Sequence, residues 1–156
     1  MIGLGENFDI ILDQVEKVRT KELLYMVFRF QENNPKIYEI RESHENPNKN
    51  NKFIIKDEEE LKRGFDIFQS NIKTHGCCYA LFDFETNLED GSSRSLLFLI
   101  TLIPDEFNVK EKFLYSAHIQ RVVENLKTSV KILQINKYED LSYSRLKQVC
   151  LSLKKA

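Results

Sequence analysis

Along this chain, the spacing of hydrophobic positions switches repeatedly between a helical and a strand-like period. Residues 8–19 place their large apolar side chains on one helical stripe, and Asn7 is expected to cap the start of that helix. Residues 23–30 are rich in β-branched and aromatic side chains, which predicts a buried strand. The turn-forming residues 32–35 follow, and residues 36–40 predict a second strand that completes a hairpin.

The polar segment 42–52 interrupts the apolar pattern without marking a domain boundary. It contains one proline, four asparagines and no large apolar side chain. Neither flank could build a hydrophobic core alone, so the segment predicts a loop or disordered insertion within one domain spanning residues 1–156. After it, residues 57–69 predict a helix, because large apolar side chains recur at helical spacing behind an acidic first turn.

The clearest succession of elements lies between Cys77 and Leu126. A buried strand begins near Tyr79 and leads to Asp90-Gly91, a pair that is typical of hairpin turns. The almost wholly apolar run 96–103 then predicts a strand that is covered on both faces. After a proline, residues 110–127 predict one long helix. Its apolar stripe has the spacing i, i+4, i+7 and i+11 and consists of Tyr115, Ile119, Val122 and Leu126.

The C-terminal part adds one strand and one helix. Residues 131–135 predict a short last strand, and Ser142 is expected to cap a final helix that bears Leu146, Val149 and Leu153. The sequence contains no internal repeat. Helices that alternate with mostly antiparallel strands predict an α/β or α+β fold, in which a central mixed sheet of about five strands is sandwiched between helices.

Composition and charge narrow the class of protein. The chain has 156 residues, of which 42% are hydrophobic and 30% charged, as in a soluble globular protein. Its formal net charge of −1 argues against a nucleic-acid binder, which needs a basic excess to neutralise phosphates. No apolar run approaches the roughly 20 residues of a membrane-spanning helix, and the first residues lack the features of a signal peptide. Three cysteines are too few for a disulfide framework, so we expect a cytoplasmic protein.

The residue types that carry catalysis do not form a recognisable group. Cys77 and Cys78 are adjacent on a predicted strand, so their side chains point to opposite faces and cannot share a tetrahedral metal. We expect one core thiol and one surface thiol. The three histidines lack partners at the spacing of a metal site or a Cys-His couple, and no phosphate-binding loop is present. We therefore expect no enzyme and no cofactor. A small cysteine-dependent enzyme, in which the fold brings a histidine to one of these thiols, is the remaining alternative.

Four segments, in a characteristic order and spacing, resemble the actin-depolymerising-factor/cofilin homology family. CYALFDF resembles a family strand that usually reads RYAL or RYAV followed by an aromatic residue and Asp, and LLFLITLIPD resembles the next strand. KEKFLYSAHIQRVV resembles the family's long helix, and VKILQINKYEDLSYSRL resembles its closing strand and helix. The match runs from Gly76 to about Leu153, and the N-terminal half fits in element order only. It implies the gelsolin-like fold of this family, with residues 42–52 as an insertion.

The resemblance also implies a function. Family members are non-catalytic, cytoskeleton-associated proteins that bind actin subunits and modulate filament disassembly and turnover, and we expect this chain to do so as a monomer. They wedge the long helix and the N-terminal segment into the cleft at the base of an actin subunit. Here the helix keeps the family's basic pair at Lys110 and Lys112. Matched residue by residue, the actin-binding surface would comprise Met1, Ile2, Gly3, Leu4, Lys110, Lys112, Phe113, Ser116, Ile119, Gln120 and Val123.

The chain also departs from the family pattern. Ile119, Val123 and Glu124 stand where the long helix usually carries a second basic cluster, and Ile119 is equally well explained as part of the core stripe. On the second, filament-side surface, Arg94 keeps one basic position and Lys147 could compensate for others. At the remaining positions where the family carries charges, this chain has the uncharged residues Leu96, Gln148, Val149 and Ser152. The regulatory serine that many members carry near the N-terminus is missing. These differences predict weak filament severing.

A sister branch, the glia maturation factors, is the alternative. Its members bind the branch-nucleating actin-related protein complex instead of actin, and their long helix also lacks the second basic cluster. Their closing segment contains Glu-Asp-Leu followed by Ser or Thr, as residues 139–142 do here. Lys110 and Lys112, however, are the residues of an actin binder. Actin is therefore the first expected partner, and the actin-related complex the second.

Overall fold

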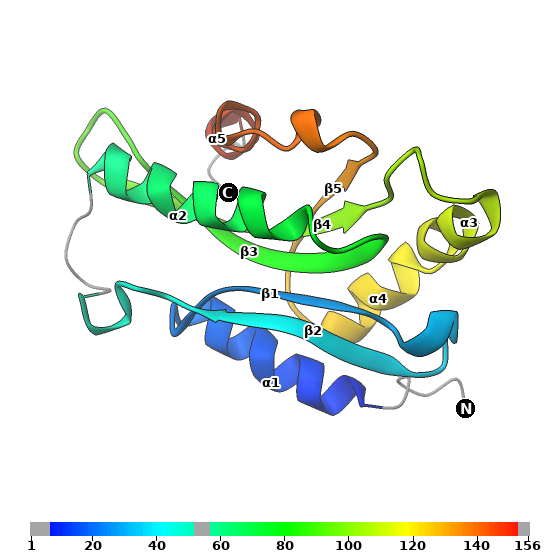
Figure 1. Ribbon diagram of the computed structural model, residues 1–156. Coiled ribbons are helices and arrows are strands. Elements are labelled where there is room, and N and C mark those ends of the chain that lie inside the picture. Colours follow the sequence, from blue (N-terminus) through cyan, green and yellow to red (C-terminus); the bar gives the residue numbers. More distant parts are fainter. Residues whose placement is uncertain (1–6, 52–56, 153–156) are drawn as a thin grey trace.

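A five-stranded mixed sheet forms the centre of the molecule (Figure 1), seen in a computed structural model that describes residues 7–51 and 57–152. The strands lie in the order β2-β1-β3-β4-β5, and all neighbours are antiparallel except β4 and β5, which are parallel. Their bounds are β1 Leu23–Phe30, β2 Tyr38–Glu45, β3 Cys78–Asn87, β4 Ser93–Leu102 and β5 Lys131–Ile135. The predicted fold class is confirmed.

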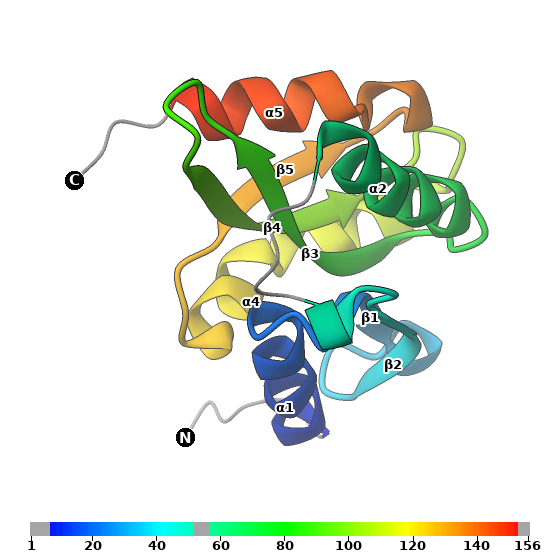
Figure 2. The ribbon, with the colours of Figure 1, turned by 90° about the vertical axis from the view of Figure 1, so that its left-hand side faces the viewer.

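Helices cover both faces of this sheet (Figures 1 and 2). One face carries α1 (Phe8–Arg19), α3 (Val109–Ala117) and α4 (Ile119–Leu126), whose buried side chains share a core with Met26, Leu81 and Leu99. The opposite face carries α2 (Glu58–Ile72) and α5 (Tyr143–Ser152), which enclose a second core around Phe82, Phe98 and Ile100. Short 3-10 turns lie at Gln31–Asn33, Lys49–Asn51 and Tyr138–Asp140. None of the helices in the described ranges is long and apolar enough to cross a bilayer.

The two helical layers correct the prediction for the cysteines. Cys77 is 2% exposed and Cys78 is 0% exposed, so neither is a surface thiol. Their side chains do point to opposite faces, because Cys77 belongs to the core under α1, α3 and α4 and Cys78 to the core under α2 and α5. A strand with one exposed face would have left one thiol in water, but here both faces are covered.

The loop predicted over residues 42–52 begins later than expected. Strand β2 continues to Glu45, and its residues Glu42, Ser43 and His44 pair with Val27, Met26 and Tyr25 of β1. An edge strand with one exposed face can consist of polar residues, which is why hydrophobicity did not reveal it. A 3-10 turn at Lys49–Asn51 follows, and Lys52 lies outside the described residues.

The predicted cap at Ser142 and the predicted turn at Gly91 are confirmed, whereas the predicted cap at Asn7 is wrong. Asp57 caps α2 by accepting a hydrogen bond from the Glu60 amide at 2.8 Å, and Ser142 Oγ accepts one from the Arg145 amide at 3.2 Å. Gly91 takes the hairpin turn between β3 and β4 with a φ of 88°. Asn7, in contrast, does not cap α1 with its side chain. Its Nδ2 donates to the carbonyl of Tyr38 instead, at 3.3 Å.

The helix predicted over residues 110–127 is broken in two. Helix α3 ends at Ala117, α4 starts at Ile119, and His118 between them has a φ of −106° and a ψ of 7°. The apolar stripe keeps its phase across the break, since Tyr115, Val122 and Leu126 are all buried. Hydrophobic spacing alone therefore could not reveal the interruption.

Candidate functional site

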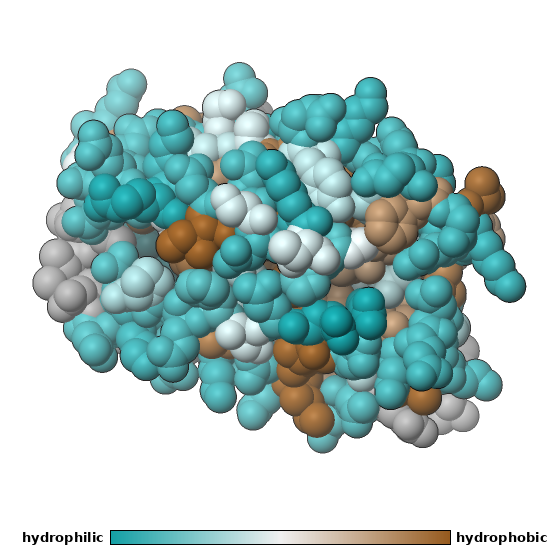
Figure 3. Space-filling model, viewed as in Figure 1, coloured by the Kyte–Doolittle hydropathy of each residue, from teal (hydrophilic) through white to brown (hydrophobic). Residues whose placement is uncertain are grey.

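The outer face of α3 exposes two large apolar side chains. Val109 is 78% exposed and Phe113, one helical turn later, is 70% exposed. Burying an apolar side chain of this size is worth about 1.5–3 kcal/mol, so two of them in water on one turn indicate a contact surface. Hydrophobic atoms emerge over α3 at the right-hand edge of Figure 3. Phe113 was predicted to be a contact residue and Val109 was not, although Val109 lies four residues before Phe113, on the same face of the helix.

The two lysines of the predicted basic pair have different surroundings. Lys110 is exposed, whereas Lys112 is half-buried and its Nζ donates to the carbonyl of Asp105 at 3.2 Å. Asn108 starts the helix by accepting a hydrogen bond from the Glu111 amide at 2.8 Å, which fixes the first turn that carries both lysines. Ser116 is exposed on the same helix, and its hydroxyl donates to the Phe113 carbonyl at 3.2 Å.

The other predicted contact residues divide into three groups. Ile119 and Val123 of α4 are half-buried and pack against the core, as the core-stripe explanation requires. Gln120 is exposed. The N-terminal residues of the predicted surface, Met1, Ile2, Gly3 and Leu4, lie outside the described residues. The structure thus brings Lys110, Lys112, Phe113 and Ser116 together on α3 and adds Val109 to them.

The predicted filament-side cations are both engaged within the chain. Arg94, on β4, donates from Nη1 to the carbonyl of Cys150 in α5 at 3.1 Å. Lys147 of α5 forms a hydrogen-bonded ion pair with Glu58 at the start of α2, and this hydrogen bond raises the pKa of Lys147. Any partner that used Lys147 would have to displace the Glu58 carboxylate.

The cysteines lack the properties of catalytic nucleophiles. Burial raises the pKa of the Cys77 thiol to about 12, and it also raises the pKa of Cys78. A nucleophilic cysteine needs a low pKa and access to substrate. The histidines have other partners, since His75 meets the Glu42 carboxylate at 2.8 Å and His118 meets the Leu114 carbonyl at 2.8 Å. Within residues 7–51 and 57–152, no group of His, Cys, Asp and Glu side chains could hold a metal ion.

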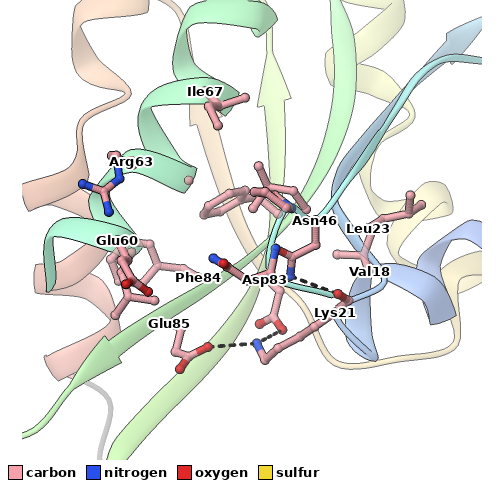
Figure 4. Close-up of a pocket in the computed structure, with 16 residues that line it drawn as sticks. Val18, Lys21, Leu23, Asn46, Glu60, Arg63, Ile67, Asp83, Phe84 and Glu85 are labelled. Carbon is pink, nitrogen blue, oxygen red and sulfur yellow. Dashed lines mark hydrogen bonds and ion pairs between the residues drawn. The ribbon is translucent and has the colours of Figure 1, made fainter. Parts of the chain in front are cut away.

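A pocket of about 380 Å³ lies between α2, β1 and β3 (Figure 4). At its base Lys21 Nζ lies 2.8 Å from Asp83 Oδ2 and 3.3 Å from Glu85 Oε1. Burial opposes the charge on Lys21, but the two carboxylates together raise its pKa. Burial also raises the pKa of Asp83, against the attraction of Lys21. Lys21 thus bridges the two carboxylates and ties the α1–β1 turn to β3.

Comparison of the amino-acid sequence with known proteins identifies a family. The family model of the cofilin/tropomyosin-type actin-binding proteins matches residues 7–151. Actin-depolymerizing factor 8 of Arabidopsis thaliana is 30% identical over 83 residues, which are 53% of this chain and 59% of that protein. The chain therefore aligns with less than two thirds of that relative's length.

Solved structures resemble the fold over nearly the whole chain. Plasmodium berghei actin depolymerization factor 2 has a TM-score of 0.71 at 18% identity, with 93% of this chain and 94% of that chain covered. Glia maturation factor from Caenorhabditis elegans has a TM-score of 0.59 at 12% identity, with 90% and 91% covered. At such identities the likeness concerns the fold alone. Because the family model matches residues 7–151, the chain belongs to the cofilin/tropomyosin-type actin-binding protein family.

Proposed function

We propose that this protein binds actin subunits through α3 and thereby modulates filament disassembly and turnover, as a cytoplasmic monomer at the cytoskeleton. The observation that carries the proposal is the exposed pair Val109 and Phe113 beside the exposed cation of Lys110. Membership in an actin-binding family supports the choice of partner. No step of this function requires a catalytic group or a cofactor.

The chemistry of α3 fits an apolar cleft with an acidic rim. Aromatic side chains that fill a pocket contribute most of the affinity in many interfaces, and Phe113 is the aromatic side chain that α3 exposes. A cation at the rim, such as Lys110, accelerates encounter with an acidic surface and makes the association rate depend on salt. We assign Phe113 and Val109 to the contact centre and Lys110 and Lys112 to its rim.

Filament severing is expected to be weak. A second contact on the filament would draw on Arg94 and Lys147, and both make hydrogen bonds inside the chain. The rest of this surface offers uncharged groups, since Gln148 and Ser152 are exposed and Val149 is half-buried. Rapid fragmentation of filaments under the microscope would contradict this part of the proposal.

The actin-related complex is the second candidate partner, and one observation favours it. The outer face of α4 exposes Gln120 and Glu124, while the one basic residue of the helix, Arg121, donates to the Pro35 carbonyl. Actin binders of the family usually place a basic cluster on this part of the helix, so a partner that does not require those charges would tolerate α4 as it is.

Binding assays with the whole protein separate the two candidates. Binding to ADP-loaded and ATP-loaded monomers, together with co-sedimentation with filaments, tests actin. Pull-down with the purified actin-related complex tests the alternative. We expect binding to monomers in at least one nucleotide state. If neither monomers nor filaments bind while the actin-related complex does, the second candidate replaces the first.

A further inference from the structure

Strands β1 and β3 stop pairing with each other before either strand ends. Their last antiparallel pair is Tyr25 with Phe82, whereas β1 begins at Leu23 and β3 continues to Asn87. The pocket between these strands and α2 lies beyond that last pair (Figure 4). The cavity therefore forms where the sheet itself opens, in the middle of the strand order.

Apolar side chains form much of the wall of this pocket. Phe82 and Phe84 of β3 are buried, and Leu24 of β1 and Ile67 of α2 are half-buried. Gly64 of α2 leaves room beside them, because a Cβ at this position would lie 3.3 Å from Cδ1 of Leu24. The volume of about 380 Å³ lies within the range of about 300–1,000 Å³ that is typical of small-molecule sites.

The base of the pocket carries more negative than positive charge. The carboxylates of Asp83 and Glu85 share the ammonium group of Lys21, and these side chains are only 12%, 16% and 22% exposed. Burial raises the pKa of Asp83 in spite of Lys21. Arg19 is a further cation that acts on Asp83, and it is itself paired with Glu16 at 2.7 Å. One negative charge thus lacks a full counter-charge in surroundings where a lone charge is costly.

The backbone around Lys21 holds this charged base in place. Lys21 has a φ of 66°, and its carbonyl accepts a hydrogen bond from Nδ2 of Asn46 at 2.9 Å. The amide of Asn46 donates to the Glu22 carbonyl at 3.0 Å, and Asn46 is itself only 9% exposed. The polar groups of the pocket are therefore ordered before any ligand arrives, which lowers the cost of binding.

We propose that this pocket binds a small aromatic amine in its protonated form, with the ring against the apolar wall and the ammonium group beside Asp83 and Glu85. A cation supplies the missing counter-charge, whereas an anion would add to the excess negative charge. The other charged residues of the lining, Glu60 and Arg63, have opposite signs and leave that excess unchanged. The lining comes from α1, β1, α2, β3 and the turns beside them, so the proposal does not depend on actin binding by α3.

Three indoles that differ in charge test the proposal on the whole protein. Tryptamine carries a protonated amine, tryptophol a hydroxyl group and indole-3-propionate a carboxylate on the same ring system. The chain contains no tryptophan, so selectively excited indole fluorescence reports the probe. We expect saturable binding of tryptamine, binding of tryptophol that is weaker by about tenfold or more, and no measurable binding of indole-3-propionate, because hydrogen bonds between charged groups are the stronger ones. If tryptamine does not saturate, or tryptophol binds equally well, the proposal is wrong.

Two variants then locate the binding site. Glu85→Gln removes the excess charge and should weaken tryptamine about tenfold while changing tryptophol by less than about twofold. Glu59→Gln makes the same change of charge on an exposed residue of α2 outside the lining and should alter neither affinity. Gly64→Leu puts a side chain into the cavity and favours helix, so both indoles should be lost at an unchanged melting temperature. Equal effects of the two Gln variants on tryptamine would overturn the assignment, and this comparison decides even if Gly64→Leu folds poorly.

Discussion

The α3 face and the α5 side of this molecule both carry cations in the sequence, but the structure uses them differently. On α3, Lys110 is exposed beside Val109 and Phe113, which the fold leaves in water. On the α5 side, Arg94 is bonded to the Cys150 carbonyl and Lys147 to Glu58. A basic residue at a family position is therefore not yet a binding group. What matters is whether its own chain already supplies a partner.

The cost of this internal pairing is modest. An exposed ion pair is worth about 0–1 kcal/mol, and the Lys147 and Glu58 side chains are 31% and 58% exposed. A filament could therefore compete for Lys147, at a penalty of less than about fivefold in affinity. Burying the apolar pair Val109 and Phe113 in a complex involves larger free energies than displacing this ion pair. Mutations of apolar side chains should therefore distinguish the two surfaces most clearly.

The largest effect is expected where both surfaces depend on the same core. Val122 of α4 is 0% exposed, so Val122→Asp places an unpaired charge in the core at a cost of several kcal/mol, against a typical total stability of about 5–15 kcal/mol. We expect loss of the cooperative thermal transition and of every binding activity. Gln120→Asp, on the exposed side of the same helix, is the control and should melt normally. An unchanged melting temperature for Val122→Asp would show that α4 does not support the fold as described.

Next in size is the loss of the exposed aromatic ring. Phe113→Ala should weaken monomer binding by about 2 kcal/mol, or roughly 30-fold, because the ring is buried only in the complex. The melting temperature should stay unchanged, since Phe113 is 70% exposed in the free protein. Leu151→Ala removes an apolar side chain that is 44% exposed on α5 and serves as the matched control. Equal effects of the two variants in a titration of monomer binding would erase the distinction between the two surfaces.

Reversing the charge of one lysine at a time should have a smaller effect than removing the Phe113 ring, and the two lysines should differ in it. Replacing both Lys110 and Lys112 by Glu is expected to abolish measurable binding, but the single variants should differ. Lys110→Glu should lower the association rate more than Lys112→Glu, because Lys112 already donates to the Asp105 carbonyl. Stopped-flow association at several salt concentrations measures this, and the difference should shrink as salt rises. A larger effect of Lys112→Glu would mean that its hydrogen bond breaks on binding and that it is the more important cation.

The sequence allowed much of this comparison to be predicted, because hydrophobic spacing reports burial directly. The order of elements, the hairpin at Asp90-Gly91 and the burial of Val122 all follow from local patterns. What could not be predicted depends on contacts between distant residues. Tyr79 reaches the Tyr115 carbonyl from β3, and no period in the α3–α4 segment shows that the helix is broken there.

The same limit applies to the functional surfaces. Phe113 was selected because its position matches the family helix, whereas the exposure of Val109 depends on how α3 leaves the core. The pairing of Lys147 with Glu58 joins α5 to α2 across a long stretch of chain and has no sequence signal. The prediction of one surface thiol was wrong for a related reason, since the helices that cover Cys77 and Cys78 on the two faces of the sheet are far away in sequence.

The smallest expected effect tests the internal pairing on the α5 side. Glu58→Gln removes the carboxylate that holds Lys147 and should release the cation toward a filament. The gain cannot exceed the worth of the exposed pair, about 0–1 kcal/mol, so severing counted by microscopy should rise by less than about fivefold. Glu59→Gln, which removes the neighbouring exposed carboxylate, controls for the change in net charge. If both variants raise severing equally, the general loss of negative charge is responsible. A rise with Glu58→Gln alone would mean that the fold restrains a filament contact which the sequence still contains.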